Sequence, residues 1–230
     1  MAKESNFKNL TLTLFLITLL SSLGLGVMYT VTKEPVEQAK EAKVINALKQ
    51  VLPDFDNKPN DEVTHDSVMG SELLVYHASL KGEPVGIAVK SVSDKGFSGN
   101  VVIMVGFDMG GNIVGYSVLD QKETPGLGTK MVDWFKPQTK AEPSLVERIF
   151  GFTVKVPERK SSIIGLNAEN ANLTVSKDGG DVDAITAATI SSRAFLDAVS
   201  KAHIAFKNSI AATTQASQQT TVKEEGVSNE

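Results

Sequence analysis

The chain contains an uncharged apolar run near its N-terminus, from Leu10 to Val31. As an α-helix, a run of this length spans about 30 Å, the thickness of the hydrocarbon core of a bilayer. It is longer than the apolar part of a secretory signal, roughly 7–15 residues, and no small-x-small cleavage site clearly follows it. The sequence therefore predicts a retained transmembrane helix at residues 10–31, preceded by a short tail at residues 1–9.

Lysines flank the predicted span on both sides, at Lys3 and Lys8 before it and at Lys33, Lys40 and Lys43 after it. Their distribution does not fix the orientation of the helix. Long domains cross a membrane largely regardless of charge, so we expect the large C-terminal part to be translocated. We predict a single-pass protein of the inner (cytoplasmic) membrane, with its N-terminus in the cytoplasm and its large domain on the periplasmic, extracytoplasmic side.

After the span, apolar residues at helical spacing predict a connecting helix at residues 32–53, which Pro53 ends. Residues 54–70 are polar and rich in turn formers. Four segments with the composition of strands follow, at Glu72 to Leu80, Pro84 to Ser91, Asn100 to Phe107 and Asn112 to Leu119. The last two are joined by Gly-Gly-Asn and predict an antiparallel hairpin.

Meandering strands with segregated helices indicate an α+β domain. The sequence has neither an alternating βα pattern nor a Gly-x-Gly-x-x-Gly motif, so a Rossmann fold is not expected. A helix at Pro143 to Phe150 and a strand at Phe152 to Val156 are predicted further along. The last residues, 208–230, are poor in apolar side chains and predict a disordered tail.

Composition excludes several kinds of site. The formal net charge is −4, and the chain lacks the blocks of Lys or Arg expected of a nucleic-acid-binding protein. It has no cysteine, which excludes disulfides, thiolate zinc sites and cysteine nucleophiles. The three histidines are not spaced as metal ligands, so we expect no metal site.

A segment of small and hydroxyl residues, from Asp183 to Arg193, opens into an amphipathic run. A helix start carries unpaired N–H groups and the positive end of the helix dipole, so a hydroxyl there lies where a phosphate would be held. This points to Thr189. Ser and Thr are also favoured helix N-caps, so Thr189, Ser191 or Ser192 could serve only to satisfy N–H groups. The segment alone leaves both interpretations open.

The same segment resembles the acceptor motif for covalent flavin attachment, Asp-x-x-(Ser/Thr)-Gly-Ala-Thr. Asp183, Thr186, Ala188 and Thr189 match it, and Ala187 stands in place of the usual glycine. In that motif a flavin transferase links FMN through its phosphate to the last threonine. The extra methyl group would hinder modification if the backbone at Ala187 needs a positive φ, which glycine adopts freely.

A second motif, Glu-Thr-Pro-Gly-Leu-Gly at residues 123–128, would by itself be an ordinary surface turn. It follows a Gly-Phe-Ser-Gly segment at 96–99 and a Gly-x-Ile-x-Gly segment at 111–115. Together with the acceptor motif, these segments resemble the FMN-binding domain of the G subunit of the Rnf complex, an ion-pumping ferredoxin:NAD oxidoreductase. The resemblance covers residues 5–207. The C subunit of the sodium-pumping NADH:quinone oxidoreductase is similar.

The resemblance implies one N-terminal transmembrane helix and an FMN-binding domain at residues 54–207, with FMN held covalently by Thr189. It implies a recognition role for the other acceptor residues and a place beside the flavin for the loop at 123–128. The implied cofactor-binding residues besides Thr189 are Asp183, Thr186, Ala187, Ala188, Glu123, Thr124, Gly126, Leu127 and Gly128. Trp134 and Phe135 could pack near the flavin ring, although core packing is the stronger expectation.

The implied function is electron relay through the flavin, coupled in the whole complex to Na⁺ or H⁺ movement. The implied partners are other membrane and peripheral subunits of the complex, and a flavin transferase for maturation. No acid–base pair, triad or metal set is recognisable, so we expect no substrate turnover by this chain alone. The alternatives are the C subunit of the sodium-pumping enzyme, or a membrane-tethered binding or scaffold protein without redox function.

Overall fold

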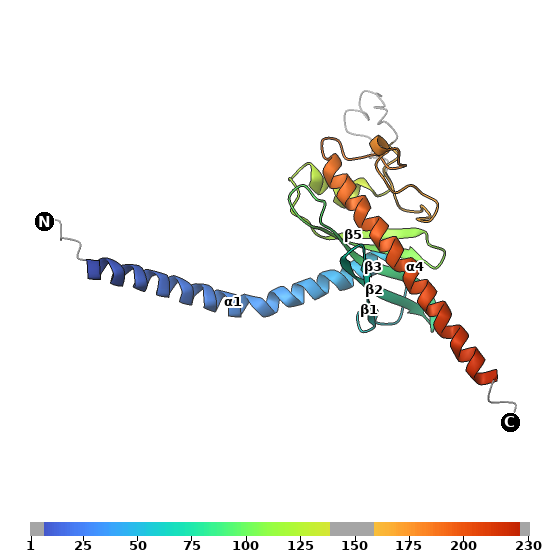
Figure 1. Cartoon of the computed structure of the whole chain (residues 1–230), viewed down its shortest axis with the longest axis horizontal. Helices are drawn as coiled ribbons and strands as arrows, with labels where there is room; N and C mark the ends of the chain where they lie inside the picture. Colours follow the sequence, from blue (N-terminus) through green and yellow to red (C-terminus); the bar gives the residue numbers. More distant parts are fainter. Residues whose placement is uncertain (1–6, 139–158, 226–230) are drawn as a thin grey trace, which may run out of the picture. The chain divides into compact units, whose positions relative to one another are not determined.

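The computed structural model describes residues 7–138 and 159–225. The chain forms two compact units, Met1–Val44 and Ile45–Glu230. The helix and the strand predicted between residues 143 and 156 lie outside the described residues. Figure 1 shows the second unit as a sheet with a long helix, α4, across it.

Helix α1, Phe7–Val51, contains a stretch that is long and apolar enough to cross a membrane, with a mean hydropathy of 2.1 and no buried residues. Its threonine hydroxyls donate to carbonyl oxygens one turn earlier, as Thr11 Oγ1 does to Phe7 O at 2.9 Å. Each hydroxyl is therefore satisfied within the helix, as an apolar environment requires. The predicted connecting helix at 32–53 is helical as far as Val51, and it continues the apolar stretch without a break, because α1 runs through Pro35. Proline has a helical φ and removes a single N–H donor, so it did not end the helix.

The sheet has five antiparallel strands in the order of the sequence, β1-β2-β3-β4-β5. The strands are β1 Val63–Val68, β2 Ser71–Leu80, β3 Glu83–Ser93, β4 Val101–Asp108 and β5 Ile113–Asp120. The four predicted strands and the β4–β5 hairpin are confirmed, as is the α+β class. Strand β1 was missed, since the sequence of residues 54–70 predicted only turns. Three of the six residues of this edge strand are exposed and only Val68 is buried, so β1 lacks the run of buried apolar residues that marks the other strands.

Helix α4, Thr189–Glu225, packs on one face of the sheet. The ring of Phe195 stacks on Phe135 at a centroid distance of 4.3 Å, and Phe206 packs against Phe107 at 5.0 Å. The prediction of a disordered tail from residue 208 differs from the structure, in which α4 continues to Glu225. The segment has few apolar residues but no glycine or proline before Gly226, so nothing in it breaks a helix.

The last turns of α1 cover the other face of the sheet. Ala47, Leu48 and Val51 are buried there. Val51 lies against Gly106 of β4 and Gly115 of β5, and Leu52 lies against Gly86 of β3, where the glycines leave room. Between β5 and α4 the described chain is mostly irregular, with short helices η1 Gly128–Lys130, α2 Met131–Trp134 and η2 Ser176–Asp178.

Candidate functional site

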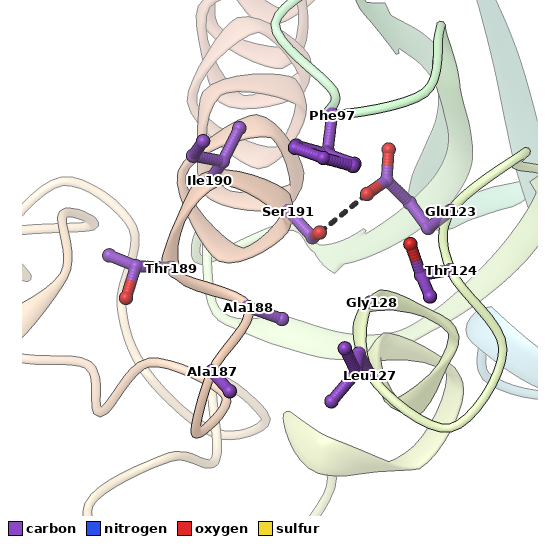
Figure 2. A pocket seen from close by; sticks show the side chains of 10 residues that line it. All are labelled: Phe97, Glu123, Thr124, Leu127, Gly128, Ala187, Ala188, Thr189, Ile190 and Ser191. Carbon is purple, nitrogen blue, oxygen red and sulfur yellow. Dashed lines mark hydrogen bonds between the residues drawn. The ribbon is translucent and has the colours of Figure 1, made fainter.

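Three segments that are far apart in the sequence meet at a cavity of about 420 Å³ (Figure 2). One is the loop after β3, the second is the loop after β5, and the third is the beginning of α4. The lining residues are Phe97, Glu123, Thr124, Leu127, Gly128, Ala187, Ala188, Thr189, Ile190 and Ser191. The structure thus brings most of the loop at 123–128 beside most of the acceptor segment, and the volume lies within the range of small-molecule sites.

Glu123 joins the three segments. Its side chain is 4% exposed. The Ser191 hydroxyl donates to Oε2 at 2.5 Å, and the Ser98 backbone N–H donates to Oε1 at 3.1 Å. One carboxylate therefore fastens the start of α4 and the loop after β3 to the loop after β5.

Two glycines make this close approach possible. A Cβ at Gly128 would lie 2.5 Å from Ser191 Oγ and 2.7 Å from Glu123 Cβ. A Cβ at Gly96 would lie 2.1 Å from Gly99 O and 2.8 Å from Glu123 Oε1. All four distances are shorter than real Cβ contacts, so any residue with a Cβ would clash at Gly96 or at Gly128.

The loop at 123–128 is shaped by its own hydrogen bonds. The Leu127 N–H donates to Thr124 O at 3.1 Å, and the Gly126 N–H donates to Thr129 Oγ1 at 2.9 Å. Gly126 has a φ of +75°, which favours glycine. The loop therefore presents Thr124 and Leu127 to the cavity from a defined backbone.

The acceptor segment forms a tight turn before α4. The Ala188 N–H donates to Ile185 O at 3.0 Å, and Ala187 at the third position of this turn has a φ of +63°. Turns with a positive φ at this position favour glycine. The methyl group of Ala187 thus lies where the motif usually has none, in a backbone conformation that L-residues avoid.

The beginning of α4 has free donors. The Ser192 N–H makes the first bond of the helix, to Ala188 O at 3.0 Å. The N–H groups of Thr189, Ile190 and Ser191 have no partner among the described residues. They form the unpaired, electropositive end of a long helix.

The three hydroxyls that could cap this helix have different environments. Ser192 Oγ accepts from the Ile185 N–H at 2.9 Å and donates to Ala188 O at 3.0 Å. Ser191 points toward Glu123, whereas Thr189 projects from the other side of the helix start (Figure 2). The Thr189 hydroxyl has no hydrogen-bond partner within the described part of the chain, so it serves no capping role there.

Two predicted residues of the acceptor motif do not line the cavity. Asp183 accepts from the Lys160 N–H at 2.9 Å and from the Ser176 hydroxyl at 3.0 Å. It therefore orders the loops that precede α4. Thr186 is exposed in the turn. In the loop at 123–128, Gly126 shapes the turn and does not line the cavity either.

The aromatic residues near the motif pack elsewhere. Phe135 is fully buried under α4, and the indole N–H of Trp134 donates to Asp183 O at 2.9 Å. Sequence reasoning missed the aromatic ring that does line the cavity, Phe97, which is 66% exposed. Its position between the two glycines of the segment at 96–99 was the available signal. Ile190, 48% exposed, adds a second apolar side chain to the rim.

Within the described ranges, 7–138 and 159–225, no group of three or more His, Cys, Asp or Glu side chains lies close enough to hold a metal ion. The cavity wall is instead formed by apolar side chains, a buried carboxylate and the free donors of α4. Such a wall suits an organic ligand with a flat apolar part and an anionic group.

Replacing Ala187 with glycine is expected to stabilise the protein by about 0.5–1 kcal/mol, because it relieves the positive φ at the expense of some chain entropy. Denaturant unfolding of the detergent-solubilised chain, followed by the fluorescence of Trp134, measures the difference. Ala188 is the matched control, since it is buried and is not among the residues with positive φ. Ala188→Gly relieves no positive φ, so it should lack the stabilisation expected of Ala187→Gly. Equal effects of both changes would contradict the argument from φ.

Comparisons with known proteins show what the domain around this cavity is similar to in sequence. A model of the FMN-binding domain family matches residues 96–203, which include all three segments around the cavity. The chain is 32% identical over 205 residues to the G subunit of the ion-translocating oxidoreductase complex of Aliivibrio fischeri, an alignment of 86% of this chain and 89% of that protein. The G subunit of Shewanella loihica is 32% identical, over 86% and 88% of the two chains. That of Vibrio atlanticus is 31% identical, over 79% and 82%.

Proposed function

The chain belongs to the G-subunit family of ion-translocating oxidoreductase complexes, and from this we propose that it is an electron-transfer subunit whose FMN is attached through a phosphoester to Thr189. The observation that carries this proposal is the position of the Thr189 hydroxyl. It is unpaired among the described residues, stands at the start of α4, and borders the cavity that the loop at 123–128 closes. A helix cap would have its hydroxyl engaged with the helix.

The beginning of α4 would hold the phosphate. The N–H groups of Thr189, Ile190 and Ser191 are free to donate to it, and the helix dipole favours a negative charge there. Apolar side chains would hold the ring, with Phe97, Leu127 and Ile190 at the rim of the cavity. The bound FMN would supply the redox chemistry, because it can exchange one or two electrons, and the protein would supply its position and electrostatic surroundings.

Attachment needs a separate flavin transferase. A threonine hydroxyl is a weak nucleophile, and in the described structure no carboxylate or imidazole is hydrogen-bonded to Thr189. The transferase would supply the base that takes the hydroxyl proton, form the bond from Thr189 Oγ1 to the FMN phosphorus of FAD, and release AMP. The exposed turn at Thr186 and Ala187 leaves the approach to Thr189 open.

The chain would work inside a membrane complex. Residues 10–31 would cross the bilayer, with residues 1–9 in the cytoplasm and the flavin domain on the extracytoplasmic side. Other membrane and peripheral subunits would deliver and remove the electrons, and the complex would couple this transfer to Na⁺ or H⁺ movement. A covalent bond would keep the cofactor from being lost to the outside medium.

Mass spectrometry of the chain made together with a flavin transferase tests the proposal. Trypsin would release the peptide Asp178–Arg193, which contains Thr189 and three other hydroxyl residues. We expect its mass to increase by that of an esterified FMN, with fragment ions that place the addition on Thr189. The denatured protein should also fluoresce as a flavoprotein in an SDS gel. An unmodified peptide from a host that modifies other acceptor proteins would refute the proposal.

A further inference from the structure

Glu123 differs from the other acidic residues of the chain. Of the Asp and Glu side chains in residues 7–138 and 159–214, it is the one that is buried. It also lines the cavity that borders Thr189. A buried carboxylate is unfavourable unless hydrogen bonds or an opposite charge compensate it. The groups around Glu123 therefore show how its charge is tolerated.

Glu123 is compensated by neutral donors. It accepts from the Ser191 hydroxyl and the Ser98 N–H, and it is in no ion pair among the described residues. Neither the lysines nearest in sequence, Lys122 and Lys130, nor Lys95 in the loop after β3 forms an ion pair with it. Lys95 pairs with Asp197 at 2.6 Å, and Lys122 and Lys130 are exposed. Among the residues that the structure describes, the cavity wall therefore contains one carboxylate without an ion-pair partner.

Resting on the flavin site proposed above, we propose that Glu123 sets the redox potential of the bound flavin. Reduction adds negative charge to a flavin ring, and a carboxylate that has hydrogen-bond donors but no ion-pair partner, at the wall of the same cavity, opposes that addition. The effect is strong at a buried position, because little water or salt screens the interaction. Glu123 thus makes the flavin a stronger reductant than the apolar cavity alone would.

The test is a spectroelectrochemical titration of the full-length, flavin-loaded chain in detergent. Glu123→Gln removes the charge and keeps the size of the side chain, so its midpoint potential is expected to shift to more positive values. Glu123→Asp keeps the charge and should stay closer to the wild type. Both variants disturb packing, so equal shifts in the two would overturn the proposal. An unshifted potential in Glu123→Gln would overturn it as well.

Glu169→Gln is the control for net charge. Glu169 is paired with Lys207 at 2.7 Å and lines a different cavity, near Phe206. Glu169→Gln should leave the midpoint potential of the flavin unchanged. A shift equal to that of Glu123→Gln would contradict a local effect of Glu123. The flavin content of the wild-type chain is measured first by in-gel fluorescence. A wild-type chain without flavin would refute the function proposed above, whereas a loaded Glu123→Gln chain with the wild-type potential would refute only the role of Glu123.

Ser191→Ala gives a second measurement that does not depend on Glu123 variants folding. It removes a hydrogen-bond donor to the carboxylate and keeps the charge, which becomes less compensated. The midpoint potential should then shift to more negative values, opposite to Glu123→Gln, and a positive shift would overturn the proposal. Thermal unfolding of the flavin-free forms establishes that each variant is folded before its potential is compared.

Discussion

The Thr189→Ala chain is expected to carry no covalent flavin and yet to fold as stably as the wild type. The loss of label follows because the substitution removes the only atom to which the phosphate is proposed to be bonded. Stability should change by less than about 0.5 kcal/mol, because the Thr189 hydroxyl has no partner in the described structure. A helix cap at this position would instead lose about 1 kcal/mol on truncation to alanine. In-gel flavin fluorescence and denaturant unfolding measure the two quantities on the same protein.

Two matched variants separate the hydroxyl from the shape of the side chain. Thr189→Val keeps the branched shape and lacks the hydroxyl, so it should also remain unlabelled. Thr189→Ser keeps the hydroxyl and should accept flavin. Full labelling of Thr189→Val would move the attachment point to another residue of the segment. A stability loss of about 1 kcal/mol in Thr189→Ala, with the label retained, would favour the capping interpretation over the flavin site.

The parts of the fold that the sequence predicts are those with strong local signals. The run at 10–31 and the valine- and isoleucine-rich strands β3 to β5 are apolar over much of their length, so each can be recognised from its own residues. Strand β1 forms because β2 offers it an edge to pair with, from Val63 opposite Tyr76 to Val68 opposite Ser71. Its own residues, Val-Thr-His-Asp-Ser-Val, carry little sign of that tertiary pairing.

In the candidate site, too, local motifs could be predicted from the sequence, whereas contacts that depend on the tertiary arrangement could not. The two motifs predict that the loop at 123–128 and the start of α4 belong to one site, and the structure places them at one cavity. Neither motif indicates that Ser191 would bind Glu123, or that Phe97 would join from the loop after β3. Those contacts depend on how β3, β5 and α4 are arranged in the folded domain. The positive φ of Ala187 could be anticipated, because a motif glycine often marks such a backbone position.

A large loss of stability is expected on the face of the sheet that α1 covers, where Gly106→Ala should destabilise the protein by about 3 kcal/mol or more. A Cβ at Gly106 would lie 1.9 Å from Val51 O and 2.6 Å from Val51 C. These are backbone atoms, which cannot move aside as a side chain can. The last turn of α1 would have to leave the sheet and expose Leu48 and Val51, whose burial is worth roughly 1.5–3 kcal/mol each.

The neighbouring glycines give a graded series for the same measurement, in which Trp134, the only tryptophan, reports unfolding in denaturant. Gly115 faces Gly106 across β4 and β5, and its Cβ would lie 3.1 Å from Gln50 O, so Gly115→Ala should cost about 1–2 kcal/mol. Gly110 is in the turn between these strands, where a Cβ would approach side-chain atoms at 3.3 Å. Gly110→Ala should change stability by less than about 1 kcal/mol. If the three variants lost equal stability, the loss would come from replacing a glycine and not from the close approach of α1 to the sheet.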